Sequence, residues 1–240
     1  MTDASFPSVR VSAPDRFVDE AADTIADAIR DSIAARGGCR IALAGGGTPK
    51  PIYAALAQRG DVDWSAVRFF FGDERAVGPS DPSSNYRMVR TTLLDPIAAS
   101  DDHVFRIHGE DDPEQAAAAY DARLGTEPLD LVLLGMGGDG HTASLFPGDP
   151  GIDVTDRRVV VTTSPVAPTT RISLTLPAID AAHRVVLLVS GAGKAERLAE
   201  VWQQIAARTP SLPVARVATE RLHWHVDALA ASALPSKGIQ

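Results

Sequence analysis

The sequence has one cysteine and no long apolar run, and each shortage excludes a class of protein. Cys39 has no second cysteine within the chain, which excludes a domain held together by internal disulfide bonds. No apolar run approaches the ~20 residues that a membrane-spanning helix needs. The segment 1–7 (MTDASFP) lacks the basic region and apolar core of a signal peptide. We therefore expect a cytoplasmic protein with no membrane partner.

Positive charge is also scarce. The formal net charge is −8 and the sequence pI is about 5.2, which argues against a nucleic-acid partner, because such proteins normally present a basic face. A small anionic substrate is not excluded, since a few placed cations suffice to bind it. Only Lys50, Lys194 and Lys237 are lysines, and the other basic residues are arginines. A lysine in a glycine turn, such as Lys194, therefore stands out.

Apolar segments of strand length alternate with helical segments along nearly the whole chain. This order predicts an α/β fold in which helices cover both faces of a mostly parallel sheet. At 240 residues the chain can bury a core large enough to fold without disulfides or a metal. It contains no repeat and no convincing linker, so we expect a single domain, 1–240, that is a monomer or a weak homo-oligomer.

Periodicity and turn residues place the individual elements. The first helix is expected to start at 12–15 and to stop at Gly37 and Gly38, after a lead-in, 1–11, that holds an edge strand. The last residues are expected to form a tail. The expected strands are 40–44, 67–71, 104–107, 129–135, 159–161, 172–176, 184–189, 214–218 and 223–226. The expected later helices are 51–58, 87–94, 113–124, 177–182, 195–208 and 227–234.

Glycine turns follow three of the expected buried strands. Gly45, Gly46 and Gly47 lead into a helix, where close backbone approach and free N–H groups favour an anion, and Thr48 adds a hydroxyl. The alternative is a tight turn with no ligand. The segment 191–194 (GAGK) is too short for a Walker A loop. Lys194 at a helix start opposes the helix dipole, so we interpret it as a phosphate ligand rather than a solvated lysine.

The turn at 135–141 (GMGGDGH) presents Asp139 and His141. It matches G-x-G-x-x-G, but a dinucleotide site is rejected because Asp139 would face the pyrophosphate and Pro147 leaves no room for the required helix. Ligands of open α/β folds bind at the carboxyl ends of parallel strands, where this turn is expected to lie. His141 is therefore a candidate general base, and Asp139 could orient its ring. The alternative is a structural histidine.

Further polar residues follow other strands. Asp73, Glu74 and Arg75 end one strand, and Arg75 suits recognition of a phosphate or carboxylate, although a local salt-bridge cluster is equally compatible with that position. Arg87 and Arg171 are further candidate cations. The pair of imidazoles in 223–225 (HWH) gives only two metal ligands, with no cysteine or third histidine near them in the sequence, so no metal site is expected.

Taken together, these motifs resemble the 6-phosphogluconolactonase family. The resemblance is carried, in order and spacing, by 44–49 (AGGGTP), 71–75 (FGDER), 84–87 (SNYR), 134–148 (LGMGGDGHTASLFPG), 171–177 (RISLTLP), 191–194 (GAGK) and 223–227 (HWHVD). It implies hydrolysis of 6-phospho-D-glucono-1,5-lactone to 6-phospho-D-gluconate in the oxidative pentose phosphate pathway. It also implies a three-layer Rossmann-like fold, shared with glucosamine-6-phosphate deaminase and ribose-5-phosphate isomerase, and no metal or other cofactor.

The resemblance also implies roles for particular residues. The base role falls on His141, with Asp139 as its neighbour, and sugar-phosphate contacts fall on Gly46, Gly47, Thr48, Asp73, Arg75, Arg171 and Lys194. A lactone is an activated ester, so a base that takes a proton from water is sufficient. Two alternatives stay open at this point. One is an amino-sugar-phosphate deaminase or isomerase with Asp73 as its base, and the other is a non-catalytic sugar-phosphate sensor.

Overall fold

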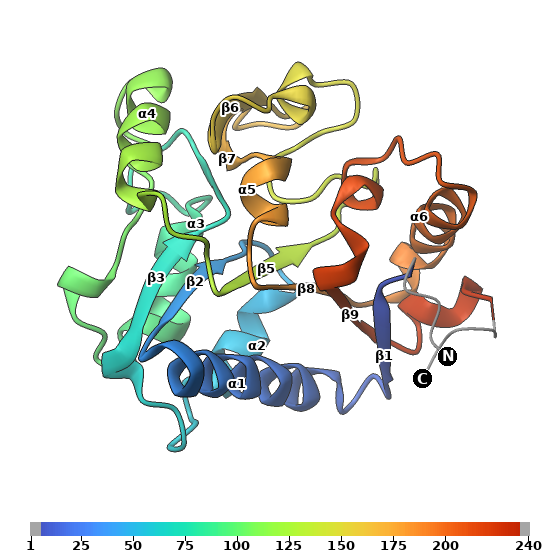
Figure 1. Ribbon diagram of the computed structural model, residues 1–240, viewed down its shortest axis with the longest axis horizontal. Helices are drawn as coiled ribbons and strands as arrows, with labels where there is room; N and C mark the ends of the chain where they lie inside the picture. The colour runs from blue at the N-terminus through green and yellow to red at the C-terminus, as the bar shows by residue number, and fades with distance from the viewer. Residues whose placement is uncertain (1–5, 236–240) are drawn as a thin grey trace.

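The main sheet has six parallel strands. A computed structural model describes residues 6–235, and Figure 1 shows the sheet crossing the middle of the molecule. The strands, in their spatial order, are β1 (Ser8–Ser12), β9 (Leu222–Asp227), β8 (Arg184–Val189), β5 (Leu131–Gly135), β2 (Cys39–Leu43) and β3 (Val67–Phe71). The chain adds β3 on one side of β2 and all later strands on the other. The strand order therefore reverses between β2 and β5, where open α/β sheets bind ligands.

Helices pack on both faces of this sheet. Helices α1 and α2 lie below it in Figure 1, and α4, α5 and a small second sheet lie above it. The helices are α1 (Phe17–Arg36), α2 (Pro49–Leu56), α3 (Asn85–Val89) with a π-helical turn (Arg90–Leu94), α4 (Pro113–Leu124), α5 (Leu176–Asp180) and α6 (Ala195–Ala207). The expected α/β fold with a mostly parallel, helix-covered sheet is confirmed. Gly37 ends α1 in the left-handed conformation, as its position after the helical pattern predicts.

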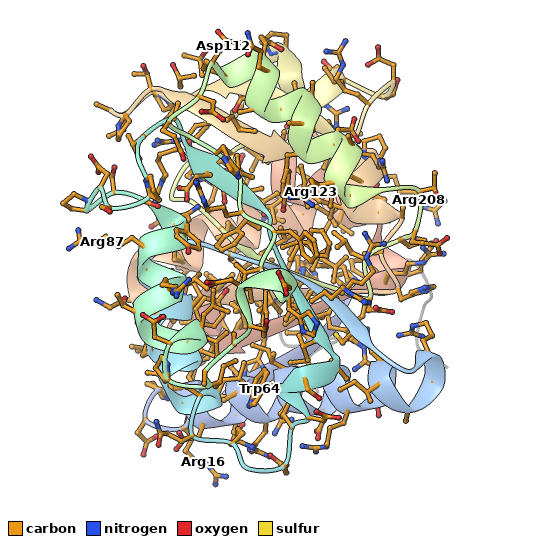
Figure 2. The ribbon with its side chains drawn as sticks, turned by 90° about the vertical axis from the view of Figure 1, so that its left-hand side faces the viewer. Arg16, Trp64, Arg87, Asp112, Arg123 and Arg208 are labelled. Carbon is orange, nitrogen blue, oxygen red and sulfur yellow. The ribbon has the colours of Figure 1, made fainter. Side chains whose placement is uncertain are left out.

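The core fills the space between the helices and the sheet. In β5, Leu131 to Leu134 are at most 1% exposed, because a parallel strand with both faces covered has no solvent side. Figure 2 shows this from the side: carbon-rich side chains crowd the interior, and the labelled Arg16, Arg87 and Asp112 project from the periphery. Within residues 6–235, no helix combines the length and apolarity needed to cross a membrane.

A second, antiparallel sheet was not predicted from the sequence. It consists of β4 (Asp73–Arg75), β7 (Thr170–Leu174) and β6 (Val159–Thr163), in that order. The chain passes from β3 into β4 through Gly72 alone, whose N–H donates to the Leu43 carbonyl (2.9 Å) and whose carbonyl accepts from the Leu174 N–H (2.8 Å). The small sheet is thereby fixed at the carboxyl edge of the large one.

Three predicted elements are wrong. The segment 104–107 forms one bridge, from Val104 to Phe69, because the chain then turns back and packs Gly109 against the backbone of β4. The segment 214–218 is a 3-10 turn (Pro213–Arg216), whose Val214 N–H donates to the carbonyl of Gly140 instead of pairing in a sheet. The segment 227–234 contains only a 3-10 turn (Ala230–Ala233), because β9 continues through Asp227.

The predicted start of the first helix, at 12–15, is also wrong. The expected edge strand of the lead-in is β1, which pairs in parallel with β9. Ser12 does not start the first helix. It is the last residue of β1, and its hydroxyl donates to the Glu20 carboxylate (2.8 Å), so that α1 begins only at Phe17. Residues 1–5 of the lead-in and the expected tail, 236–240, lie outside the described part of the chain.

Candidate active site

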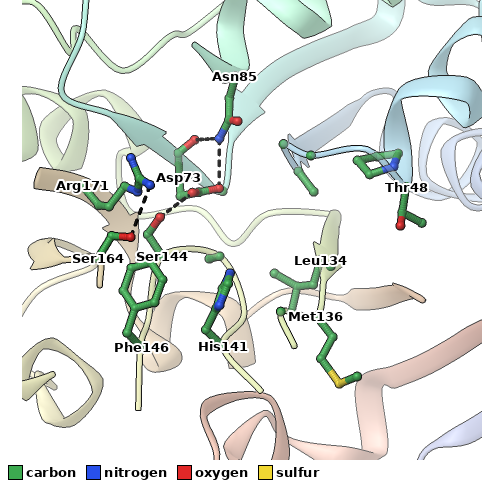
Figure 3. A pocket seen from close by; sticks show the side chains of 18 of the residues that line it. Thr48, Asp73, Asn85, Leu134, Met136, His141, Ser144, Phe146, Ser164 and Arg171 are labelled. Atoms are coloured by element: carbon green, nitrogen blue, oxygen red, sulfur yellow. Dashed lines mark hydrogen bonds between the residues drawn. The ribbon is translucent and has the colours of Figure 1, made fainter. Parts of the chain in front are cut away.

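A cavity of about 480 Å³ opens at the carboxyl ends of β2 and β5, a volume in the range of small-molecule sites. The turns after β2, β5 and β8 and the second sheet form its walls. It brings together every residue to which the family resemblance gave a role: Gly46, Gly47, Thr48, Asp73, Arg75, Asp139, His141, Arg171 and Lys194. Figure 3 shows four of these side chains, those of Thr48, Asp73, His141 and Arg171, around a common space.

The His141 imidazole is held by Asp139. Its Nδ1 lies 2.6 Å from Oδ1 of Asp139, which also accepts the backbone N–H of His141 (3.1 Å). Partial burial alone would raise the pKa of the Asp139 carboxyl, but the bonds and charge of His141 outweigh it and hold that pKa below its usual value. A charged acceptor at Nδ1 places the proton of the neutral ring there and leaves Nε2 as the proton acceptor.

Two glycines of the turn beneath His141, Gly137 and Gly140, are required by its geometry. The Gly137 N–H donates to the His141 carbonyl (2.9 Å), and a Cβ on Gly137 would lie 2.1 Å from the ring Nδ1. Gly140 has φ +85°, which side-chain-bearing residues rarely adopt. The Phe146 ring completes the setting, with its centroid 4.7 Å from that of His141. The imidazole therefore has one well-defined position.

We expect Gly137→Ala to displace the imidazole and to lower kcat by roughly 10- to 100-fold, since a shift of about 1 Å in a catalytic group can cost that much. The backbone of Gly137 does not require a positive φ, so the fold should persist. Steady-state kinetics with a thermal melt checks both points. Gly60→Ala is the control, because a Cβ there meets no atom within 4 Å. A Gly137→Ala enzyme with the activity of the parent would contradict this account of the turn.

The two arginines of the second sheet face each other across a strand pair. Arg75 of β4 is paired in register with Arg171 of β7. Arg171 is 7% exposed, and its Nη2 donates to the Ser164 hydroxyl (3.3 Å) and the Val166 carbonyl (3.4 Å). Burial, and then the charge of Arg75, lower the pKa of Arg171 below its ordinary value. Two such neighbouring cations favour an anionic ligand, which would offset their repulsion.

Arg171 also has an unused donor. Its Nη1 is buried and has no hydrogen-bond partner among residues 6–235. A buried donor without an acceptor typically costs ~1–3 kcal/mol, and more when it is charged. A ligand that supplies an oxygen at this side of the cavity would remove that cost.

The glycine turn after β2 forms another wall of the cavity, and Gly46 and Gly47 line one recess together with Arg75 and Arg171. Gly46 has φ +102°, and Thr48 precedes α2 without capping it by a side-chain hydrogen bond. The Thr48 hydroxyl instead lies 3.2 Å from the Ser190 hydroxyl, which ties this turn to the one after β8. Pro49 and Pro51 have no N–H, so the backbone donors that this uncapped helix start offers an anion are those of Lys50 and of the glycine turn itself.

Lys194 ends a short 3-10 turn (Ala192–Lys194) that precedes α6. The turn is fixed by Gly191, whose N–H donates to Oδ2 of the buried Asp227 (2.9 Å) and whose φ is +92°. Lys194 lines the cavity and makes no ion pair with any residue in the described range. Its charge is therefore left for a ligand.

Asp73 differs from the other polar groups in that both of its carboxylate oxygens are occupied. Oδ2 accepts from the buried Ser144 hydroxyl (2.5 Å), and Oδ1 accepts from the Asn85 amide (3.2 Å). These bonds, drawn dashed in Figure 3, hold the side chain at the floor of the cavity. Asp73 is therefore a carboxylate that hydrogen bonds hold in one position.

Several cavity residues were missed from the sequence. They are Asn85, Ser144, Phe146 and Ser164. The first three lie within the motifs 84–87 and 134–148, so their motif membership was the available signal. Uncharged or apolar side chains carry no chemical signature of their own, and only the fold shows that they face the cavity.

Other candidates lie away from the cavity. Arg87 is exposed on α3 and does not line it. His223 and His225 of β9 contact the hydroxyls of Ser8 and Ser12, respectively, in the neighbouring strand. In the described chain no group of three or more His, Cys, Asp or Glu residues has the arrangement of a metal site.

The fold and the cavity define an α/β protein with an oriented histidine–aspartate pair opposite a group of cations, as in enzymes that act on small anionic substrates. Residues 12–224 match the family of glucosamine-6-phosphate isomerases/6-phosphogluconolactonase. The chain belongs to that family. It is 38% identical over 239 residues to the 6-phosphogluconolactonase of Mycobacterium tuberculosis, a match that covers 92% of this chain and 96% of the relative.

Other relatives agree with this assignment. The 6-phosphogluconolactonase of Treponema pallidum is 42% identical over 182 residues, covering 71% of this chain and 75% of that protein. The solved structure of 6-phosphogluconolactonase from Trypanosoma brucei superimposes with a TM-score of 0.83 at 30% identity, covering 95% of this chain and 99% of that one. The family resemblance noted in the sequence is thus confirmed.

Proposed function

We propose that the protein hydrolyses 6-phospho-D-glucono-1,5-lactone to 6-phospho-D-gluconate, the lactonase step of the oxidative pentose phosphate pathway. The observation that carries the proposal is the 2.6 Å contact between His141 and Asp139 in a cavity that also holds Arg75, Arg171 and Lys194. It combines an oriented base with cations for a phosphate. Membership in a family whose relatives carry this name supports the choice of substrate.

In the proposed mechanism, neutral His141 takes a proton from a water molecule through Nε2 while the water oxygen attacks C1 of the lactone. Asp139 accepts a hydrogen bond from the Nδ1–H group and stabilises the imidazolium that forms. Base catalysis of this kind contributes roughly 10²–10⁴-fold. Collapse of the tetrahedral intermediate breaks the bond from C1 to the ring oxygen. His141 then returns the proton to that oxygen, which becomes the 5-hydroxyl of the product.

The phosphate is assigned to Arg171, Lys194 and the turn formed by Gly46, Gly47 and Thr48. Arg171 has an unpartnered buried nitrogen, and Lys194 has no ion pair within the described residues, so both charges are available. Arg75 and Asp73 are assigned to the sugar side. Holding the phosphate at one end of the cavity places C1 near His141, and such positioning can supply several kcal/mol of the barrier reduction.

The mechanism uses no cofactor and no metal, since a lactone carries its own leaving group. We therefore expect the rate of lactone hydrolysis by the purified protein to exceed the spontaneous rate and to be unchanged within twofold after treatment with EDTA. The measurement monitors the loss of freshly prepared lactone through the acid that its hydrolysis releases. A chelator-sensitive rate would contradict the metal-free mechanism, and a rate no faster than the spontaneous one would favour a sugar-phosphate sensor.

The deaminase or isomerase alternative requires a free base at Asp73. The relatives named above are 6-phosphogluconolactonases, which favours the lactonase reaction over one with Asp73 as its base. Incubation with glucosamine 6-phosphate tests the alternative directly, because release of ammonia would overturn the lactonase proposal.

We also propose that the chain acts in the cytoplasm as a single domain, a monomer or weak homo-oligomer without a nucleic-acid partner. Its sole cysteine, Cys39, is a buried free thiol, in keeping with a reducing compartment.

A further inference from the structure

Asn85 lies at the junction of three walls of the cavity. It is the first residue of α3, is 1% exposed, and lines the cavity beside Arg75 and Asp73. In Figure 3 its amide reaches down from the helix toward Asp73. The proposed reaction does not require an amide at this position. The contacts of the Asn85 side chain show why an asparagine is there.

The amide donates hydrogen bonds through its nitrogen and accepts one through its oxygen. Nδ2 donates to the backbone carbonyl of Asp73 (2.9 Å) and to its Oδ1 (3.2 Å). Oδ1 accepts from Nη1 of Arg75 (2.5 Å). A side chain that must donate to an aspartate and accept from an arginine at the same time can be neither acid nor base, and asparagine meets both requirements.

The flat face of the amide packs against the glycine turn. A Cβ on Gly45 would lie 1.8 Å from Oδ1 and 2.2 Å from Cγ of Asn85. The absence of a side chain at Gly45 is therefore a packing requirement of Asn85. The turn that leads to Gly46 and Gly47 is positioned against the same amide that holds Arg75.

The backbone of Asn85 is fixed as well. The buried Glu74 accepts the N–H groups of Asn85 (2.7 Å) and Tyr86 (2.8 Å) and the hydroxyl of Ser84 (3.0 Å). Glu74 stands between Asp73 and Arg75 in β4, so the strand anchors the start of α3, and α3 in turn orients the two side chains of the strand. The amide position is determined from both directions.

We propose that Asn85 is a positioning residue that sets the direction of the Arg75 guanidinium and joins it to the glycine turn; this rests on the proposed sugar-phosphate site. Nη1 of Arg75 is committed to Asn85 and to the Ser83 carbonyl (2.6 Å), while Nε and Nη2 have no hydrogen-bond partner within residues 6–235. Those two nitrogens are the edge offered to the substrate. Asn85 acts through Arg75 and does not touch the reacting atoms.

The test is a double-mutant cycle between Asn85→Leu, which keeps the shape of the side chain, and Arg75→Met. We expect Asn85→Leu to raise KM, and the Kd for 6-phosphogluconate measured by titration calorimetry, by about tenfold, with kcat within threefold of the parent. In the Arg75→Met background the same substitution should change KM and Kd by less than twofold. Independent, multiplying effects in the two backgrounds would overturn the proposal, as would an unchanged KM in Asn85→Leu.

A second variant keeps the proposal testable if Asn85→Leu does not fold. Gly45 has no positive φ, and the three atoms nearest to an added Cβ all belong to the Asn85 amide, so Gly45→Ala strains that contact first and should raise KM to a similar extent. Gly60→Ala is the matched control. Normal KM in a folded Gly45→Ala protein would overturn the proposal. A parent protein that neither hydrolyses the lactone nor binds 6-phosphogluconate would instead refute the proposed function, so the two failures are distinguishable.

Discussion

Replacing His141 with alanine is expected to lower kcat for lactone hydrolysis by roughly 10²–10⁴-fold, with a small change in KM. The loss follows because the group assigned to take the proton from water is removed, while the cations assigned to hold the substrate remain. The imidazole is at the surface of a cavity and not in the core, so the thermal unfolding midpoint should change little. Steady-state kinetics and a thermal melt on the same preparation check the prediction.

The matched control for that experiment is His108→Ala. The side chain of His108 is 53% exposed, and it lines a separate surface groove away from the catalytic cavity. Its removal should leave kcat unchanged. A decrease of less than about tenfold in the His141→Ala protein would contradict the base assignment, because general-base catalysis contributes more than that.

Substitution of Arg171 by methionine is expected to reduce kcat/KM by roughly 30- to 1000-fold, which corresponds to about 2–4 kcal/mol of lost binding to the phosphate. The structural reason is the buried guanidinium with an unpartnered Nη1 beside the charge of Arg75. The same substitution removes an unpaired buried charge, so the protein should be as stable as the parent or more stable. Kinetics and thermal melting together separate loss of binding from loss of fold.

Arg87→Met is the control for this prediction, since Arg87 is an exposed arginine that does not line the cavity. It should leave kcat/KM within twofold of the parent. If Arg171→Met reduced kcat/KM by less than fivefold, or lowered stability as strongly as a core substitution, the phosphate assignment would be contradicted and Arg171 would have a purely structural role.

The main sheet could be predicted from the sequence because its central strands, such as β5 and β8, are buried on both faces. The segment 185–189 (VVLLV), for example, is a continuous apolar run between Arg184 and Ser190, and the strand there is Arg184–Val189. The short antiparallel sheet could not be predicted as a unit. Its β4 has three residues, Asp73–Arg75, all polar, and its pairing with β7 depends on contacts almost a hundred positions apart in the chain.

The polar edge of the site was predictable for a similar reason. Glycine turns after buried parallel strands must meet at one edge of the sheet, so His141, Thr48 and Lys194 could be placed together without coordinates. Segment 214–218 (VARVA) was mispredicted because its apolar residues are typical of a short buried strand. Val214 is buried there as part of a brace for the His141 turn, a tertiary contact that has no local sequence signal.

Asn85 illustrates what sequence reasoning of this kind omits. Charged and nucleophilic residues indicate a chemical role by their type alone, whereas a single asparagine in the sequence does not. Its importance follows from bonds to Asp73 and Arg75, which precede it by 12 and 10 residues, and from the missing side chain of Gly45. The sheet-to-helix connection that brings these groups together is visible only in the fold.

The most direct test of the account is the dependence of kcat on pH for the parent protein and for His141→Gln. The base must be neutral to accept a proton, so the account predicts that kcat of the parent falls toward acid pH with the uptake of one proton. The residual activity of His141→Gln, corrected for spontaneous hydrolysis, should lack that acid limb. An acid limb of the same shape and position in both proteins would show that another group is the base and would contradict the central role of His141.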